Sequence, residues 1–221
     1  ADDVNSGQLN TGKFNGTILY VGINNEADYQ AVDVRYSRYG MKFRVGLHDI
    51  YHDFFIPIWG KHNVYNALFA IAVADHLGFS PRQIKIGLKA YRKPPRRLRV
   101  YSRKKRVRII DDTFNANPNS VKAAIDVLSS IGKGRNIAVL GSMSELGHYS
   151  RRGHKEVGRY LADKNVTRLF TFGAKARVIG KEAIFHGFSS QRVVHSSNRN
   201  TLHKRLKRTI ISGSTVLVKG S

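Results

Sequence analysis

The sequence of 221 residues predicts an α/β protein built from two domains. Strand-like and helix-like segments alternate through residues 96–221, which favours a mostly parallel sheet with helices on both faces. Residues 1–95 instead place several strand-like segments before two helix-like ones. Between them stands Lys-Pro-Pro-Arg at positions 93–96, where each proline disfavours helix in itself and in the residue before it. We therefore place the domain boundary between residues 95 and 96.

The first domain is expected to open with a small sheet. Residues 16–22 combine β-branched and aromatic side chains and predict a strand. Residues 29–34 and 41–47 predict a hairpin that turns at 38–40, because apolar and polar side chains alternate along its first arm.

Two helices are expected to complete this domain. Apolar residues recur with the helical period over residues 63–77 and stop at Gly78. The second helix begins at Ser80-Pro81, a favourable N-cap followed by proline at the first helical position, and ends near Tyr91.

The second domain is expected to alternate strands and helices. The strands are predicted at residues 106–110, 136–140, 167–172, 192–195 and 215–218. The helices are predicted at residues 119–131, 151–164, 174–186 and 198–211. The basic stretch 101–108 also predicts a hairpin that turns at 103–105.

The charge of the chain is strongly positive and unevenly distributed. Residues 1–95 hold 11 Lys and Arg against 8 Asp and Glu, whereas residues 96–221 hold 27 against 7, a net charge of +20. Such a field attracts polyanions, so salt-dependent, non-specific binding of nucleic acid is expected. The simpler interpretation is a solvated basic surface whose partner is an anion the size of a nucleotide. The alternative function is a non-catalytic module that binds polyanions or nucleic acid, although no nucleic-acid motif is recognised.

Composition argues against a secreted or membrane-spanning protein. No apolar run approaches the roughly 18 residues that a spanning helix needs. The N-terminus has neither a basic segment nor an apolar one, so no signal peptide is expected. Cysteine is absent, which excludes disulfides and fits a reducing, cytoplasmic compartment. Because there is no initiator Met, we expect the chain to begin inside a longer polypeptide or after processing.

Polar side chains gather where two predicted strands end. Residues 111–119 place two carboxylates and several carboxamides between a predicted strand and a predicted helix. Ser142 and Glu145 follow the strand at 136–140 in the same way. Open α/β sheets bind ligands at the carboxyl ends of their strands, so both segments are candidates for a ligand site. The simpler interpretation of residues 141–147 is a plain loop between a strand and a helix.

Two further carboxamides lie on one face of the first predicted helix. Asn63 and Asn66 are three residues apart, near its N-terminus. A carboxamide can donate and accept together, which suits the edge of an adenine. The alternatives are a helix cap for Asn63 and a surface amide for Asn66.

Four short sequence motifs, called strings below and numbered in chain order, resemble motifs of the Mur ligases. The resemblance is greatest to the branch that joins D-alanyl-D-alanine to UDP-N-acetylmuramoyl-tripeptide. Residues 61–68 resemble H-N-x-x-N-A. Residues 111–118 match D-D-T-Y-N-A-N-P with Phe for Tyr. Residues 138–150 resemble A-V-L-G-D-M-x-E-L-G-x-x-S, and residues 217–221 contain V-K-G-S. Folate and cyanophycin ligases are related alternatives, and the Asn-Ala-Asn-Pro string at 115–118 argues against both.

The resemblance implies a fold and an activity. It implies that residues 96–221 form a Rossmann-like C-terminal domain and that residues 1–95 are the later part of a central ATP-binding domain. The implied reaction is ATP-dependent amide ligation through an acyl phosphate, with a UDP-muramoyl-peptide and D-alanyl-D-alanine as substrates in peptidoglycan synthesis.

The resemblance also implies ATP-binding residues. Asn66, with Asn63 beside it, matches the position that contacts adenine, and Asp112 matches the carboxylate that accepts from the ribose hydroxyls. Arg97 matches an arginine that reaches the nucleotide, and a guanidinium suits phosphate oxygens. The alternative is a solvated linker arginine. Arg96 replaces a glycine of the family's pattern.

Other matching positions are expected near the substrate that supplies the amine. They are Asn115, Asn117, Ser142 and Glu145. Asn115 and Asn117 have an equal alternative in stabilising the turn before Pro118. Ser142 replaces an Asp of the family's pattern, which removes a charge there.

The parts that activate phosphate are not recognised in this sequence. No G-x-x-x-x-G-K-[ST] string is present. The resemblance places that loop, the magnesium ligands and a UDP-binding domain before residue 1. No residue is therefore assigned a catalytic or metal-binding role, and the chain alone is expected to be inactive.

Overall fold

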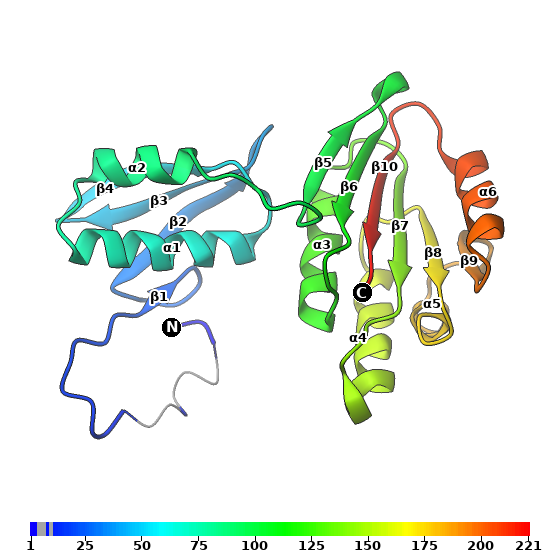
Figure 1. Ribbon diagram of the computed structural model, residues 1–221, viewed down its shortest axis with the longest axis horizontal. Coiled ribbons are helices and arrows are strands. Elements are labelled where there is room, and N and C mark those ends of the chain that lie inside the picture. Colours follow the sequence, from blue (N-terminus) through cyan, green and yellow to red (C-terminus); the bar gives the residue numbers. More distant parts are fainter. Residues whose placement is uncertain (4–7, 9–10) are drawn as a thin grey trace. The chain divides into compact units, whose positions relative to one another are not determined.

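The computed structural model describes residues 1–3, 8 and 11–221. The chain divides into two compact units, Ala1–Arg92 and Lys93–Ser221, called unit 1 and unit 2 below. Both have an α/β architecture, which confirms the predicted fold class (Figure 1). None of the helices in this described part is both long and apolar enough to span a bilayer.

Unit 1 contains a sheet of four strands. They are β1 (Val21–Gly22), β2 (Tyr29–Tyr36), β3 (Met41–Leu47) and β4 (Ile50–Ile56), side by side in that order. β1 is parallel to β2, and β2, β3 and β4 are antiparallel. The predicted hairpin is confirmed, and its turn is closed by the Ser37 N–H, which donates to the Gly40 carbonyl at 2.8 Å.

The sheet differs from the prediction in two ways. Of the strand expected at residues 16–22, only β1 forms, and Ile18, Leu19 and Tyr20 are exposed. β propensity makes a strand only where a neighbouring strand pairs with it, and within residues 16–22 the ladder with β2 covers Val21 and Gly22 only. The strand β4 was not predicted. Its turn uses His48 and Asp49 with φ of 50° and 64°, without the glycine that usually marks such a turn.

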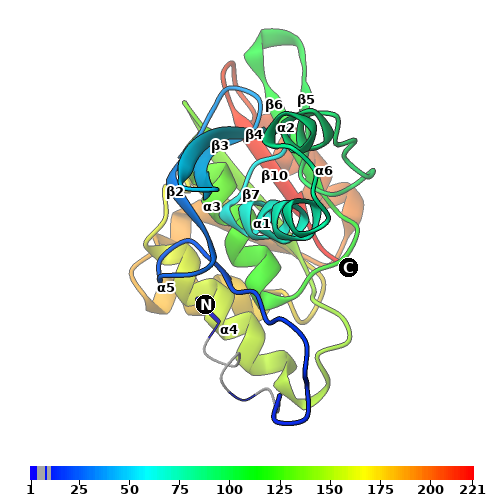
Figure 2. The same ribbon diagram turned by 90° about the vertical axis from the view of Figure 1, so that its left-hand side faces the viewer.

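Helices α1 (Lys61–His76) and α2 (Pro81–Lys89) lie on one face of this sheet (Figures 1 and 2). The alternate residues Met41, Phe43 and Val45 of β3 are at most 2% exposed and form the core with Leu68 and Ile71 of α1. The N-cap predicted for α2 is confirmed. The Ser80 side chain accepts from the Gln83 N–H, and the Gln83 side chain accepts from the Ser80 N–H.

Unit 2 contains a sheet of six strands. They are β5 (Arg99–Ser102), β6 (Arg108–Asp112), β10 (Thr215–Lys219), β7 (Asn136–Gly141), β8 (Arg168–Phe172) and β9 (Val193–Ser196), in spatial order. β5 is an antiparallel edge strand and the other five are parallel. The hairpin predicted around residues 103–105 is therefore confirmed.

Helices cover both faces of this sheet, as predicted. They are α3 (Pro118–Ile131), α4 (Ser150–Ala162), α5 (Arg177–Phe185) and α6 (Arg199–Thr209). Phe170 of β8 packs in a buried cluster with Leu202 of α6, whereas the next residue, Thr171, faces Gly180 of α5. Successive strand residues point to opposite faces, so α6 lies on the face opposite α5. α3 and α4 pack in sequence beside α5.

The strand order sets which loops meet. β10 comes last in the sequence and lies between β6 and β7, so the segments after these three strands share one edge of the sheet. β6 also begins two residues later than predicted, because Lys105 and Arg106 form the preceding turn with φ of 58° and 56°. Asp111 and Asp112 are thus the last two residues of the strand rather than the start of a loop. Short 3₁₀ turns occur at Lys104–Arg106, Gly147–Tyr149 and Ser190–Arg192.

Candidate functional site

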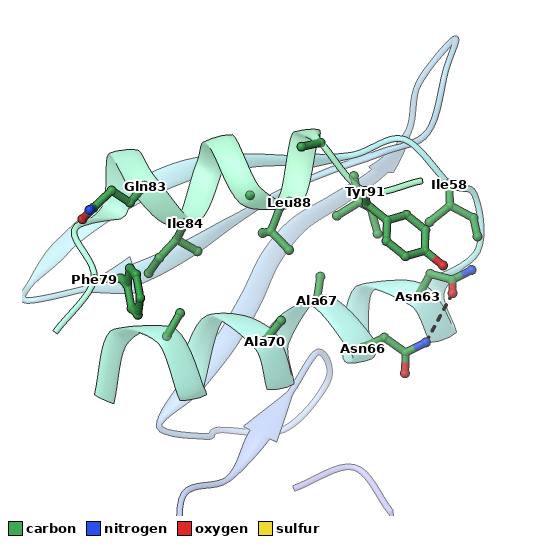
Figure 3. Close-up of a pocket in the computed structure, with 14 residues that line it drawn as sticks. Ile58, Asn63, Asn66, Ala67, Ala70, Phe79, Gln83, Ile84, Leu88 and Tyr91 are labelled. Carbon is green, nitrogen blue, oxygen red and sulfur yellow. Dashed lines mark hydrogen bonds between the residues drawn. The ribbon is translucent and has the colours of Figure 1, made fainter. Parts of the chain in front are cut away.

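Unit 1 contains a pocket between α1 and α2 with a volume of about 540 Å³ (Figure 3). Its walls are mostly apolar and include Ile84 and Leu88 of α2 and Ala67 of α1. Asn63 and Asn66 lie at one end, beside Tyr91, as Figure 3 shows. A flat apolar group with a polar edge fits such a lining, because its ring surface leaves water while its edge meets the two amides.

The two carboxamides contact each other. The Asn66 Nδ2 donates to the Asn63 Oδ1 at 3.3 Å, and the Asn63 Nδ2 donates to the Trp59 carbonyl at 2.8 Å. Asn63 is therefore held in place, while Asn66 is exposed at the end of the pocket. The capping alternative for Asn63 was wrong, because the N-cap of α1 is Gly60 and no side chain caps this helix.

The centre of unit 2 holds a buried ion pair. The Lys219 ammonium lies 2.6 Å from the Asp112 Oδ2 and donates to the Asn115 carbonyl at 2.9 Å. The other carboxylate oxygen, Asp112 Oδ1, accepts from the Leu98 N–H at 3.1 Å. Lys219 is 4% exposed and Asp112 is 9% exposed. Asp112 thereby joins Leu98, in the segment that leads into β5, to the end of β6.

Ser221 joins the segments that follow β6 and β7. Its hydroxyl donates to the Asn115 Oδ1 at 3.0 Å and accepts from the Ala116 and Ser144 N–H groups at 3.1 and 3.3 Å. The Ser221 N–H donates to the Ser142 carbonyl at 3.3 Å. Asn115 and Ser142, predicted separately, are thus brought to one place. The string V-K-G-S marked Lys219 and Ser221 in the sequence, but it gave neither residue a role.

The remaining predicted residues of this edge differ in what they contact. Asn117 is the N-cap of α3, and its side chain accepts from the Ser120 N–H at 2.8 Å. Asp111 does not contact that helix end; its Oδ1 accepts from the Thr113 hydroxyl at 2.7 Å. Glu145 is exposed with φ of 60°, and it makes no hydrogen bond or ion pair among the described residues.

The arginines at the start of unit 2 lie against the aromatic residue of the 111–118 string. The Arg97 guanidinium carbon is 4.1 Å from the centre of the Phe114 ring, and the Phe114 N–H donates to the Arg96 carbonyl at 3.1 Å. Arg96 has φ of 59°, a left-handed conformation that glycine adopts without steric cost. Arg96 therefore takes the backbone shape that the family's glycine would allow.

A buried histidine supports the segment after β7. The Met143 N–H donates to the His154 Nε2 at 3.0 Å, and the His154 Nδ1 lies 2.7 Å from the Ser150 carbonyl. The first bond needs an unprotonated Nε2 and the second a protonated Nδ1, so the ring is neutral. Burial lowers the pKa of His154, which agrees with the neutral form.

Within the described residues, no group of three or more His, Asp or Glu side chains is placed to hold a metal ion.

Comparison with protein families identifies the class. Residues 96–221 match the Mur ligase glutamate ligase domain, and residues 1–74 match the Mur ligase middle domain. The chain therefore belongs to the Mur ligase family, as the four strings predicted. It is 36% identical over 201 residues to the UDP-N-acetylmuramoyl-tripeptide–D-alanyl-D-alanine ligase of Bacillus subtilis, covering 90% of this chain and 43% of that protein. The Escherichia coli ligase of the same name is 30% identical, over 88% of this chain and 42% of its own length.

Solved structures agree on the fold. A crystal structure of MurF from Acinetobacter baumannii matches with a TM-score of 0.77 and 28% identity, over 92% of this chain and 44% of that one. MurF from Thermotoga maritima, solved with ADP, matches with a TM-score of 0.75 at 24% identity, over 92% of this chain and 45% of that one, and shows likeness of fold alone. The chain thus spans about two fifths of the length of these relatives.

Proposed function

We propose that this chain is the nucleotide- and acceptor-binding part of an ATP-dependent ligase that adds D-alanyl-D-alanine to UDP-N-acetylmuramoyl-tripeptide in peptidoglycan synthesis. One observation carries the proposal. Lys219 and Ser221 of the V-K-G-S string bind directly to Asp112 and Asn115 of the second string and to Ser142 and Ser144 of the third. Three strings far apart in sequence therefore build one polar site at the carboxyl edge of the sheet.

The proposed contacts with ATP follow from the chemistry of each residue. Asn66, steadied by Asn63, pairs with the edge of the base, while the pocket beside it accepts the ring. Asp112 accepts from the ribose hydroxyls, because an ionised carboxylate has about four acceptor positions and two are used internally. Arg97 presents a guanidinium fork to phosphate oxygens.

The proposed acceptor site lies at the ends of β6 and β7. The substrate supplies an amine, and its ammonium and amide groups are donors. Asn115 and Ser142 offer side-chain oxygens to such donors, and Glu145 offers an uncompensated carboxylate. Asn117 acts on the acceptor indirectly, because it caps α3 and so fixes the end of the loop that carries Asn115.

The proposed reaction has two steps. Phosphoryl transfer from ATP to the tripeptide carboxylate gives an acyl phosphate and ADP, and the amine of D-alanyl-D-alanine then displaces phosphate to form the amide. Mg²⁺, when bound, neutralises charge on the transferring phosphoryl group. We place its ligands outside these 221 residues, as the resemblance implies. The residues described above hold the nucleoside and orient the amine.

A chimaera tests this function. The part of the Bacillus subtilis relative that this chain does not match is joined upstream, and phosphate release is measured with the tripeptide nucleotide and D-alanyl-D-alanine. We expect release that requires the dipeptide. Arg97→Ala should remove about 1–3 kcal/mol of transition-state stabilisation, because it deletes a charged hydrogen bond. Lys181→Gln, an exposed position on α5, is the control. Release that is indifferent to the dipeptide would contradict the proposal.

A further inference from the structure

The largest unexplained feature of unit 2 is a cluster of positive charge at the amino edge of its parallel strands. We call this cluster the basic end and define it as residues 103–106, 133–135 and 204–208. These segments are the β5–β6 turn, the connection from α3 to β7 and the second half of α6. Figure 1 shows the β5–β6 turn and the loop from α6 to β10 at the same edge of the sheet.

Hydrogen bonds join the three segments into one surface. The Lys105 carbonyl accepts from the Gly213 N–H at 3.0 Å and from the Ser212 hydroxyl at 3.1 Å. The Arg135 guanidinium donates to the Thr209 carbonyl at 3.0 Å. The β5–β6 turn is thus bonded to the loop after α6, and the α3–β7 connection is bonded to the end of α6. The backbone segments that carry these cations are therefore held together.

The charge of this surface is not compensated. The basic end contains ten Lys and Arg and no Asp or Glu. Among the described residues, none of the ten forms an ion pair. Elsewhere in unit 2, by contrast, Lys155 and Arg159 of α4 both pair with Glu182 of α5. Mutual repulsion at the basic end is relieved when an anionic surface approaches.

The basic end lies apart from the proposed site of ligation. That site is at the carboxyl ends of β6, β7 and β10, and the basic end is at their amino ends. A strand of five residues spans roughly 15 Å, so both sites can be occupied together. Ten cations on three segments also exceed what one nucleotide can neutralise, which points to an extended anion.

Two details favour a lipid surface over nucleic acid. Ile211 is 48% exposed and lies three residues after Arg208, so it offers an apolar side chain beside the cations. Peripheral membrane proteins combine basic and apolar side chains in this way. The Arg99 and Arg103 guanidinium carbons lie 5.4 and 5.5 Å from the centre of the nearby Tyr101 ring, so a stacking base would compete with them for this ring. We propose that the basic end docks on the surface of an anionic phospholipid bilayer.

Vesicle binding by the 221-residue chain tests this proposal. Binding is measured by flotation with vesicles of phosphatidylcholine, alone or mixed with phosphatidylglycerol, at about 0.1 M salt. We expect binding to the anionic vesicles only. The first variant removes four cations of the basic end: Lys104→Gln, Lys105→Gln, Lys207→Gln and Arg208→Gln. The matched control removes four exposed cations elsewhere: Lys13→Gln, Arg38→Gln, Arg82→Gln and Lys181→Gln. Circular dichroism confirms that both variants are folded.

The two variants have the same net charge, so only the position of the charge differs. We expect the first to bind anionic vesicles at least tenfold more weakly and the control to stay within about twofold of the original chain. In the original chain, Ile211→Ser alone should also weaken binding to the anionic vesicles, and it should leave the affinity for a DNA duplex unchanged. Equal weakening by both variants, or equal binding to neutral vesicles, would overturn the proposal. So would a duplex that binds through the same four cations more tightly than the vesicles do.

Discussion

The Asp112–Lys219 ion pair holds together the segments that form the candidate site in unit 2. Removing two charges from water is costly, and their attraction offsets this only when further hydrogen bonds satisfy both groups. Here the Leu98 N–H and the Asn115 carbonyl supply those bonds. The pair therefore fixes three segments in position, and its main effect is on where the loop of residues 111–118 lies.

Replacing Lys219 by Met should destabilise unit 2 by about 3–5 kcal/mol, because Asp112 is left charged and buried without its partner. The measurement is urea unfolding of the whole chain followed by circular dichroism. The double variant Lys219→Met with Asp112→Leu should recover much of the loss, since no buried charge remains. A double variant as unstable as the single one would show that packing, rather than charge, accounts for the loss.

His154 gives unit 2 a defined dependence on pH. Burial lowers the pKa of this residue in the folded chain below its ordinary value of 6.5. The unfolded state therefore takes up the proton first, and the stabilising contribution is fully present above pH 6.5 and decreases as pH falls towards the folded pKa. The free energy of unfolding should fall between pH 7.5 and 5.5 by more in the original chain than in His154→Gln, which retains every other histidine. Identical pH profiles would refute this role.

At the scale of residues, the sequence predicted positions better than roles. The polar residues Asp111, Asp112 and Ser142 were correctly placed at strand ends, because the apolar strands before them are visible in the local sequence. The cap at Asn117 could be foreseen from the following Pro118 and Ser120. Lys219 and Ser221 received no role, because their partners lie about a hundred residues away and depend on where β10 inserts.

Helices were easier to predict than strands at the scale of elements. Helix periodicity and capping are local properties, so α2 and α3 began within one residue of their expected starts. Pairing between strands is not local. Residues 16–20 had the composition of a strand without a partner, and β4 formed next to β3 through a turn that lacks glycine.

The contact between α4 and α5 depends on a glycine. A Cβ on Gly158 would lie 2.5 Å from the Ile179 carbonyl oxygen and 3.1 Å from the Ala183 nitrogen, both backbone atoms. Gly158→Ala should therefore force the two helices apart and cost about 1–3 kcal/mol. Gly87→Ala in α2 is the matched control, since its Cβ would meet nothing within 4 Å. It should stabilise unit 1 by about 1 kcal/mol through helix propensity. Urea unfolding measures both, and a harmless Gly158→Ala would contradict the packing argument.

The division of charge between the two halves has a consequence for the whole molecule. Residues 96–221 carry +20, against +3 for residues 1–95. Repulsion within the second half opposes its compact state, and salt screens that repulsion. The midpoint of thermal unfolding should therefore rise as salt is increased from about 0.05 to 0.3 M. In the variant that lacks four cations of the basic end, this midpoint should rise less over the same range of salt. A midpoint that falls with salt would show that attractive ion pairs dominate instead.

Because β10 lies between β6 and β7, the order in which the ribosome makes the chain limits when unit 2 can fold. β6 and β7 emerge early and wait for a partner strand that follows 107 and 79 residues later, counted from Arg108 and Asn136 to Thr215. Until then their facing edges are open to pairing with other nascent chains. Slow elongation or a chaperone that shields these edges should therefore raise the yield of folded protein, and the final strand is the step that completes the sheet.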